Sequence, residues 1–242
     1  ARRAAIAADK PVGAFQHTPE NTYGFHDWPS GAGFIPFSRD VFIACGPYEL
    51  VPEFVFDKLF CPSVETDKTT GEVKVAQCGL RRVEAALLKE YKSNDIFIAH
   101  PEMLERCVGP ETKVIGINVM DPLGMAPVTT TMSPEKLSYV AMKFKKLCAS
   151  IIQLKKKYGF KVVVGGNGAW ELAKPDRMKI HGIDTVVIGE ADELALDLFH
   201  DLESGDAPEL LHTFVRRIEN IPSIRGPTIN SLIEAMRGCG RG

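Results

Sequence analysis

Four short loops in the sequence carry glycines and polar residues that could surround a ligand. Each loop follows an apolar run that predicts a buried β-strand. The loops cover residues 45–49, 121–124, 165–168 and 189–190. One or two glycines at strand ends are ordinary turn chemistry. Three glycine-bearing loops in succession indicate that the backbone approaches a large flat ligand.

Several common ligands do not fit these loops. A nicotinamide site needs a G-x-G-x-x-G turn after the first strand, but the turn there is Cys45-Gly46-Pro47. The same turn lacks the hydroxyl residues of a flavodoxin-type phosphate loop. A phosphoacceptor site needs a lysine after the fifth strand, where this chain has Gly189-Glu190. The sequence contains no G-x4-G-K-[ST] motif for a nucleoside triphosphate.

Strands and helices are predicted to alternate along most of the chain. Short apolar runs rich in valine and isoleucine predict strands over residues 41–45, 95–99, 113–120, 161–164 and 185–188. Apolar residues at helical spacing predict helices over residues 80–91, 101–107, 134–158, 175–181 and 192–203. The third helix has Ser133 as its expected N-cap and Pro134 at its first position.

Strands buried on both faces are typical of a parallel sheet covered by helices. We therefore expect an α/β fold with a flavodoxin-like (Rossmann-like), doubly wound, five-stranded parallel sheet of order 2-1-3-4-5. Ligands of such sheets bind beyond the carboxyl ends of the strands. This arrangement would bring the four loops to one edge.

The chain divides into four expected regions. Residues 1–39 form an irregular, aromatic-rich lead-in, and residues 40–205 form the α/β domain. Residues 206–227 contain three prolines and are predicted to be a linker, and residues 228–242 begin a further domain. Because the chain begins without Met and stops at Gly242, we expect it to be a piece of a longer protein.

Composition narrows the class of protein. The 242 residues are 45% apolar and 25% charged, with a net charge of −2, which is ordinary for a globular protein. The overall charge is not strongly basic and so does not favour nucleic-acid binding. No apolar run is long enough to span a membrane. The six cysteines are scattered without a C-x2-C pair, and no signal peptide is visible, so we expect a cytoplasmic protein with reduced thiols.

The sequence contains an ordered set of short motifs at 78–88, His100-Pro101, 109–116, 121–124, Gly165-Gly166, 182–184 and Gly189-Glu190. This set, which covers about residues 40–205, resembles the cobalamin-binding domain that precedes the catalytic barrel in cobalamin-dependent radical S-adenosylmethionine (radical SAM) enzymes. The Asp-Pro-Leu-Gly motif at 121–124 looks more like that of archaeal members.

The C-terminal segment is similar to the start of a radical SAM barrel. Such barrels open with a strand and a C-x3-C-x2-C loop that binds a [4Fe–4S] cluster. Residues 229–236 would be the strand, and Cys239 would be the first cluster ligand. A lone cysteine in a tail is the alternative.

The resemblance implies a methyltransferase. Methylcobalamin and a 5′-deoxyadenosyl radical, made from S-adenosylmethionine at the cluster, would methylate an unactivated carbon of a small molecule or a protein side chain. This piece alone is expected to be inactive. Because residues 45–49 contain no histidine, we expect cobalt without a protein histidine ligand. The alternatives are a non-catalytic cobalamin or small-ligand binding module, or a radical SAM enzyme that has lost cobalamin.

The resemblance also suggests roles for the loop residues. Tyr48 could lie near the lower corrin face or pack as an aromatic at the rim. Asn118 and Asp121 could bind corrin amides, although Asp121 could instead start a turn. Glu190 could accept a ribose or amide hydrogen bond, or cap the following helix. The candidate cofactor-binding residues are Tyr48, Asn118, Asp121, Pro122, Leu123, Gly124, Gly165, Gly166, Asn167, Gly189 and Glu190.

Overall fold

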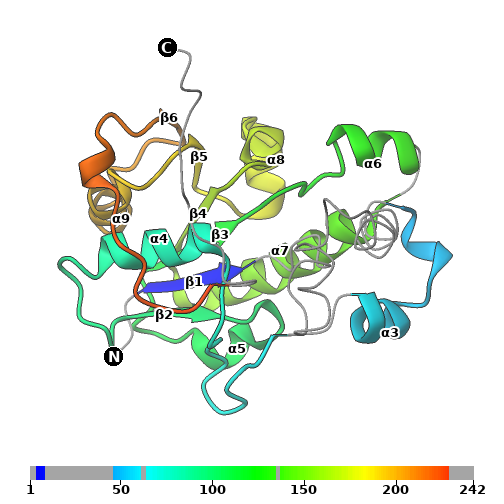
Figure 1. The fold of residues 1–242 in the computed structure, drawn as a ribbon, viewed down its shortest axis with the longest axis horizontal. Coiled ribbons are helices and arrows are strands. Elements are labelled where there is room, and N and C mark those ends of the chain that lie inside the picture. Colours follow the sequence, from blue (N-terminus) through cyan, green and yellow to red (C-terminus); the bar gives the residue numbers. More distant parts are fainter. Residues whose placement is uncertain (1–3, 9–45, 61–63, 135–136, 229–242) are drawn as a thin grey trace, which may run out of the picture.

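The computed structural model describes residues 4–8, 46–60, 64–134 and 137–228 as an α/β protein built on a parallel sheet (Figure 1). The strand order is β2-β1-β3-β4-β5-β6, and every neighbouring pair is parallel. The strands are β1 (Ala4–Ala8), β2 (Ile96–Ala99), β3 (Val114–Asn118), β4 (Lys161–Gly165), β5 (Thr185–Gly189) and β6 (Leu210–Thr213). The predicted strands over 95–99, 113–120, 161–164 and 185–188 are thus confirmed as β2 to β5.

Helices of several lengths connect these strands. The α-helices are α3 (Glu53–Val55), α4 (Cys78–Leu87), α5 (Leu104–Cys107), α6 (Pro127–Met132), α7 (Tyr139–Tyr158), α8 (Pro175–His181) and α9 (Ala195–Ser204). Short 3-10 turns cover Tyr48–Leu50, Pro101–Met103, Ala169–Leu172 and Ile218–Asn220, and a π-helical turn covers Phe56–Phe60. Among the described residues, no helix is long and apolar enough to cross a membrane.

Strand β1 corrects the expectation that residues 1–39 are irregular throughout. It lies between β2 and β3, with Ala4 opposite both Ile96 and Val114. Alanine is depleted in strands, so the run Ala4–Ala8 carries little strand signal of its own, and its pairing with two neighbours defines it. The strand predicted over residues 41–45 lies outside the described residues.

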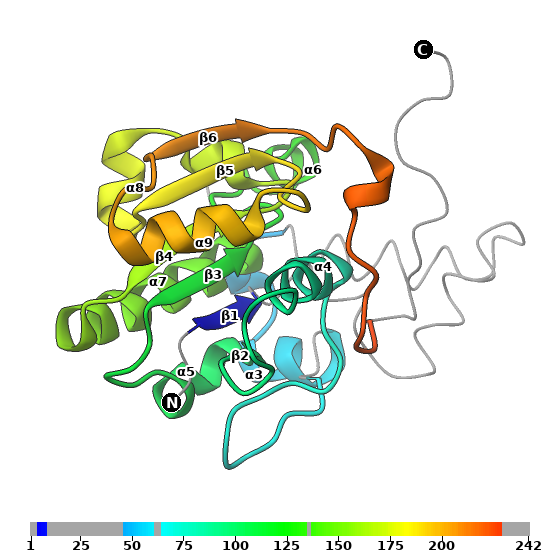
Figure 2. The same ribbon diagram turned by 90° about the vertical axis from the view of Figure 1, so that its left-hand side faces the viewer.

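The two faces of the sheet are covered by different helices (Figure 2). One face packs against α5, α7 and α8, with Phe144 and Ile151 of α7 fully buried. The strand residues on this face include Ile115, Ile117, Val162, Val164 and Val186. The opposite face packs against α4 and α9 through Val114, Val163, Val187, Leu80, Leu198 and Phe199.

Helix α7 begins later than the sequence predicts. Its N-cap is Ser138, whose hydroxyl accepts a hydrogen bond from the Ala141 amide at 3.3 Å. Ser133 instead follows the last turn of α6, a helix that the sequence did not predict. The predicted stop is confirmed, because Gly159 caps the end of α7 with a φ of 76°.

A buried lysine joins the segment around α3 to α7. The Lys143 ammonium lies 2.8 Å from carboxylates of both Glu53 and Asp57, and the Phe56 ring stacks on Tyr139 with centroids 3.9 Å apart. Hydrogen bonds from Lys143 and Lys146 lower the pKa of Glu53 to about 2. Within residues 64–77, Thr66 and Val73 form an antiparallel bridge on the two sides of a turn at residues 68–70.

The predicted linker contains strand β6. Its residues Leu210 to Thr213 pair with Val186 to Gly189 of β5. Pro208 and Pro222 flank this strand without interrupting it, which is compatible with an edge strand. The segment is therefore part of the sheet rather than a free connection.

A buried arginine fixes the last described residues against α4. The Arg81 guanidinium donates hydrogen bonds to the carbonyls of Lys74 at 2.6 Å and Pro227 at 3.2 Å, and it pairs with Glu84 at 2.8 Å. A Cβ added to Gly226 would lie 2.6 Å from the guanidinium carbon. The glycine therefore allows this backbone to lie directly on the arginine.

Candidate functional site

A cleft of about 360 Å³ opens at the carboxyl ends of β3, β4 and β5, between the sheet and helices α4 and α9. Ligand pockets in proteins span roughly 300–1,000 Å³, so this volume can receive a nucleotide-sized group. The residues that line it are Gln77, Gly79, Leu80, Arg82, Val83, Gly116, Ile117, Asn118, Val119, Met120, Val163, Gly165, Gly166, Asn167, Val187, Gly189, Glu190, Ala191, Asp192, Ala195, Leu198 and Phe199.

Glycines, which have no side chain, form the floor of the cleft. Successive residues of a strand point to opposite faces, so Gly116 shares the α4 and α9 face with Val114, and Gly165 shares it with Val163. A Cβ on Gly165 would meet Val187 at 4.0 Å, an ordinary contact. Protein packing therefore does not require a glycine at 165, and the space above it belongs to the cleft.

Helix α4 contributes a third glycine. A Cβ on Gly79 would reach 3.8 Å from the Asn118 side-chain oxygen across the cleft. The first turn of α4 thus presents backbone to the sheet edge where β3 ends.

Other glycines at this edge are required by the protein itself. Gly166 has a φ of 105°, and a Cβ there would lie 2.4 Å from both the Asn118 side-chain oxygen and the Val119 carbonyl. Gly189 has a φ of 107°, and its Cβ would lie 1.9 Å from the Thr213 carbonyl. These two glycines let loops pack closely, so their presence needs no ligand.

Polar side chains surround the floor. The Asn118 amide donates a hydrogen bond to the Gln77 side-chain oxygen, which links the end of β3 to the start of α4. The Glu190 carboxylate accepts a hydrogen bond from the Val215 amide at 2.8 Å. Arg82 and Asp192 form an ion pair at 3.5 Å. The cleft therefore offers amide, carboxylate and guanidinium groups around an apolar interior.

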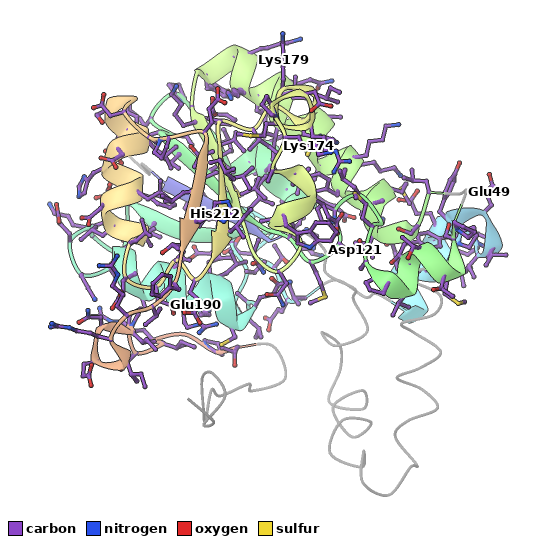
Figure 3. All side chains as sticks on the ribbon, turned by 90° about the horizontal axis from the view of Figure 1, so that it is seen from above. Glu49, Asp121, Lys174, Lys179, Glu190 and His212 are labelled. Carbon is purple, nitrogen blue, oxygen red and sulfur yellow. The ribbon has the colours of Figure 1, made fainter. Side chains whose placement is uncertain are left out.

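The structure brings together six of the predicted residues and separates the others from them. The cleft includes Asn118, Gly165, Gly166, Asn167, Gly189 and Glu190. Glu190 binds the loop after β6 and does not cap α9, whose N-cap Leu194 makes no side-chain cap hydrogen bond. Figure 3 shows Glu190 apart from Asp121, which lies on the side of α6.

Asp121 faces the protein interior, which corrects the expectation that it borders the ligand. It is 2% exposed, and its carboxylate accepts hydrogen bonds from the Ala126 amide at 2.9 Å and from the Thr129 hydroxyl. The turn that it starts includes Pro122, Leu123 and Gly124, none of which lines the cleft. The alternative expectation of a turn-forming Asp121 is the one that the structure supports.

A second buried carboxyl group accompanies this turn. Glu171 is fully buried and accepts a hydrogen bond from the Leu123 amide at 2.7 Å. Burial, together with the neighbouring Asp121, raises the pKa of Glu171 to about 8. The raised pKa favours the protonated carboxyl group, and its hydrogen bond with the Leu123 amide supports the loop after β3.

Two other predicted residues lie away from the cleft or outside the described chain. Tyr48 is exposed, and its backbone amide donates to the Leu137 carbonyl at 3.1 Å, just before α7. Cys239 lies outside the described residues. Within the described ranges, no group of three or more His, Cys, Asp or Glu side chains could hold a metal ion.

Several of the site residues that were not predicted come from the first turns of α4. Gln77, Gly79 and Arg82 belong to or adjoin the segment 78–88, which the sequence linked to the radical SAM family without assigning roles. The glycine one residue into this helix was the available signal, because glycine is unfavourable inside a helix unless close approach requires it.

The chain matches no protein-family model, and no similar protein is found among curated sequences or solved structures.

Proposed function

We propose that this chain is the cobalamin-binding part of a radical SAM enzyme that methylates an unactivated carbon. The observation that carries the proposal is the floor of Gly116 and Gly165 beside α4 and α9, at the carboxyl edge of a parallel sheet. Such an edge is where ligands of doubly wound sheets bind. The motif resemblance of residues 40–205 supplies the identity of the ligand, and the flavodoxin-like sheet is part of the same proposal.

The cleft suits the nucleotide tail of cobalamin. A flat heterocycle would lie on the glycine floor, with Val83, Val187 and Phe199 as apolar walls. The amides of Asn118, Gln77 and Asn167 can donate to and accept from carbonyl, hydroxyl and amide groups. These residues fit the chemistry of a base and a ribose.

The corrin ring would lie on the open edge above the cleft. Met120, after β3, and Trp170, in the 3-10 turn after β4, are large apolar side chains that are 45% and 47% exposed. Exposed side chains of this size are suited to cover a wide flat group and exclude water from it. No histidine is among the described residues that line the cleft, so the proposal includes a cobalt without a protein histidine ligand.

When bound, cobalamin would supply a transferable methyl group, and a cluster with S-adenosylmethionine in the longer parent protein would supply the radical that activates the carbon. Cys239 is the proposed first ligand of that cluster. The acceptor would be a small molecule or a protein side chain. The role of the described residues is to bind and orient the cofactor, so the chain alone is expected to show no turnover.

Corrinoid binding tests the proposal directly. Hydroxocobalamin is titrated into the purified chain, and binding is followed by the corrinoid absorbance and by co-elution in gel filtration. We expect about one corrinoid per chain. An electron paramagnetic resonance spectrum of the cobalt(II) form should lack hyperfine coupling to a protein histidine nitrogen. A wild-type chain that is folded but retains no corrinoid would overturn the proposal.

A pair of glycine variants locates the binding site. Gly165→Val fills the floor where a Cβ makes only an ordinary contact, so we expect a folded protein with corrinoid affinity at least about tenfold weaker. Gly109→Val is the matched control, since a Cβ there meets nothing within 4 Å and the residue lies outside the cleft. Equal corrinoid affinity in the two variants would exclude this cleft as the binding site.

The proposed [4Fe–4S] cluster is tested on the longer parent protein. A cysteine is expected directly after Gly242 and another three residues later, and Cys239→Ala should lower the iron content. Any other residues at those two positions would remove the cluster from the proposal.

A further inference from the structure

One ion pair connects the two helical walls of the cleft. The Arg82 guanidinium of α4 lies 3.5 Å from the carboxylate of Asp192, which precedes α9. The Asp192 side chain is 7% exposed and that of Arg82 is 23% exposed, and both line the cleft. Arg82 is the one basic side chain among the described residues that surround it.

The geometry leaves this pair open to competition. Direct charge-assisted hydrogen bonds between guanidinium and carboxylate groups are about 2.7–2.9 Å long, so the 3.5 Å separation is longer than the optimum. A guanidinium presents a planar fork that matches two oxygens of a phosphate. An anion that enters the cleft can therefore replace Asp192 as the partner of Arg82.

The positions of the other charges restrict where an anion can bind. The remaining ionised side chain in the cleft is Glu190, whose carboxylate already accepts the Val215 amide. Both carboxylates repel an anion, and Arg82 supplies the only positive side-chain charge among the described lining residues, so an anionic group is expected to bind beside Arg82. The apolar walls and glycine floor are suited to a flat ring, and Arg82 is suited to a phosphate attached to it.

We propose that Arg82 binds the phosphate of a ligand's nucleotide group, and that Asp192 holds the guanidinium in the cleft until this phosphate replaces it. The inference rests on the proposed function and deepens it, since it requires a corrinoid that carries its nucleotide tail. Arg82 then distinguishes complete cobalamin from tail-free corrinoids. Asp192 weakens binding of the phosphate, because its carboxylate competes for the same guanidinium group of Arg82.

The experiment compares ligands with and without the phosphate. Hydroxocobalamin and dicyanocobinamide, which lacks base, ribose and phosphate, are titrated into the wild-type chain and into Arg82→Gln. We expect the variant to bind cobalamin about 10- to 100-fold more weakly, the range of one charged hydrogen-bonding partner, and cobinamide with less than about threefold change. Arg106→Gln, an exposed arginine on α5 and the opposite face, is the control and should change neither affinity.

Two further variants test the exchange of partners. Asp192→Asn removes the competing charge, so we expect several-fold tighter cobalamin binding and unchanged cobinamide binding. Arg82→Lys keeps the charge but not the fork and should fall between wild type and Arg82→Gln. Circular dichroism shows whether each variant is folded, and if Arg82→Gln is not, Asp192→Asn and Arg82→Lys decide the question.

The outcomes separate this inference from the proposed function. Equal weakening of cobalamin and cobinamide by Arg82→Gln, or weaker cobalamin binding by Asp192→Asn, would overturn the assignment of Arg82 while leaving cobalamin in place. Flavin mononucleotide and riboflavin form a second pair that differs by a phosphate. If only flavin mononucleotide binds, and does so through Arg82, the phosphate site stands and the cobalamin proposal fails. If no probe binds the folded wild-type chain, both fail.

Discussion

Strands β3 and β4 present different side chains to the two faces of the sheet near their carboxyl ends. On the face of α7, β3 and β4 carry Ile115, Ile117, Val162 and Val164, all buried in a continuous core. On the face of α4 and α9, the same strands contribute Val114 and Val163 and then change to Gly116, Asn118 and Gly165 near their carboxyl ends.

This difference indicates that one face of the sheet mainly stabilises the fold and the other mainly binds the ligand. Side chains fill one face along its whole length, and they are omitted from the other where the cleft begins. We therefore expect substitutions on the α7 face to change the free energy of unfolding, and substitutions at the cleft floor to change ligand affinity. The following predictions test that division, beginning with the largest expected effect.

Phe144→Ala should be the most damaging change on the packed face. Phe144 is fully buried in the core between α7 and the sheet. Removing a buried phenyl ring loses its burial and leaves a cavity, at a cost of about 3–5 kcal/mol. Urea denaturation followed by circular dichroism measures this loss. Lys145→Ala, at the next and exposed position, should change stability by less than about 0.5 kcal/mol.

Glu171→Gln should change how stability depends on pH. The folded-state pKa of Glu171 is raised to about 8, so the folded protein keeps a proton that the unfolded chain releases above its ordinary pKa of 4.5. Stability should therefore fall by up to about 1.4 kcal/mol per pH unit as pH rises from 4.5 toward 8, and then level off. Glutamine imitates the protonated acid and should remove this contribution.

The measurement is the denaturation midpoint of both proteins at pH 6 and pH 8. The difference in stability between variant and wild type should grow by about 2–3 kcal/mol over this interval in favour of the variant. Parallel pH profiles for the two proteins would contradict the raised pKa.

Gly166→Ala should destabilise the protein although it lies at the cleft. Its φ of 105° is strained for alanine, and the added Cβ would meet the Val119 carbonyl at 2.4 Å. We expect a loss of about 1–3 kcal/mol, measured by thermal denaturation. An unchanged melting temperature would show that the loop after β4 can move away from β3.

Gly165→Ala should have the smallest effect on stability, less than about 0.5 kcal/mol. Its Cβ would make an ordinary 4.0 Å contact with Val187. The adjacent glycines thus form a matched pair, one needed for packing and one leaving space. A loss as large as that of Gly166→Ala would contradict this division between packing and binding.

The sequence predicts strands β2 to β5, because their valine and isoleucine runs are strong local signals, and it predicts the end of α7 from Gly159. Edge strand β6 was predicted to be part of a linker, because prolines lie on both sides of it. Strand β1 escaped prediction since Ala4–Ala8 is short and poor in β-formers, and only its pairing with β2 and β3 defines it. The start of α7 was predicted five residues too early, because Ser133 and Ser138 are equally good N-caps by residue type.

The candidate site was predictable where it follows strand ends and not where it depends on side-chain direction. Asn118, Gly165 and Glu190 lie at the cleft as their positions after or within strands imply. Asp121 occupies a similar position, but hydrogen bonds from the Ala126 amide and Thr129 turn it inward. Arg82 was missed because an arginine on a helix is usually a solvated surface group.

The contacts of Arg81 connect the cleft to the last residues that the structure describes. Arg81 ties Pro227 to α4, and the next residue on that helix, Arg82, lines the cleft. A displacement of Pro227 would therefore be passed through Arg81 to the helix that forms one wall of the cleft. Through this one buried side chain, residues 74, 84 and 227 are held to the same helix that carries Arg82 into the cleft.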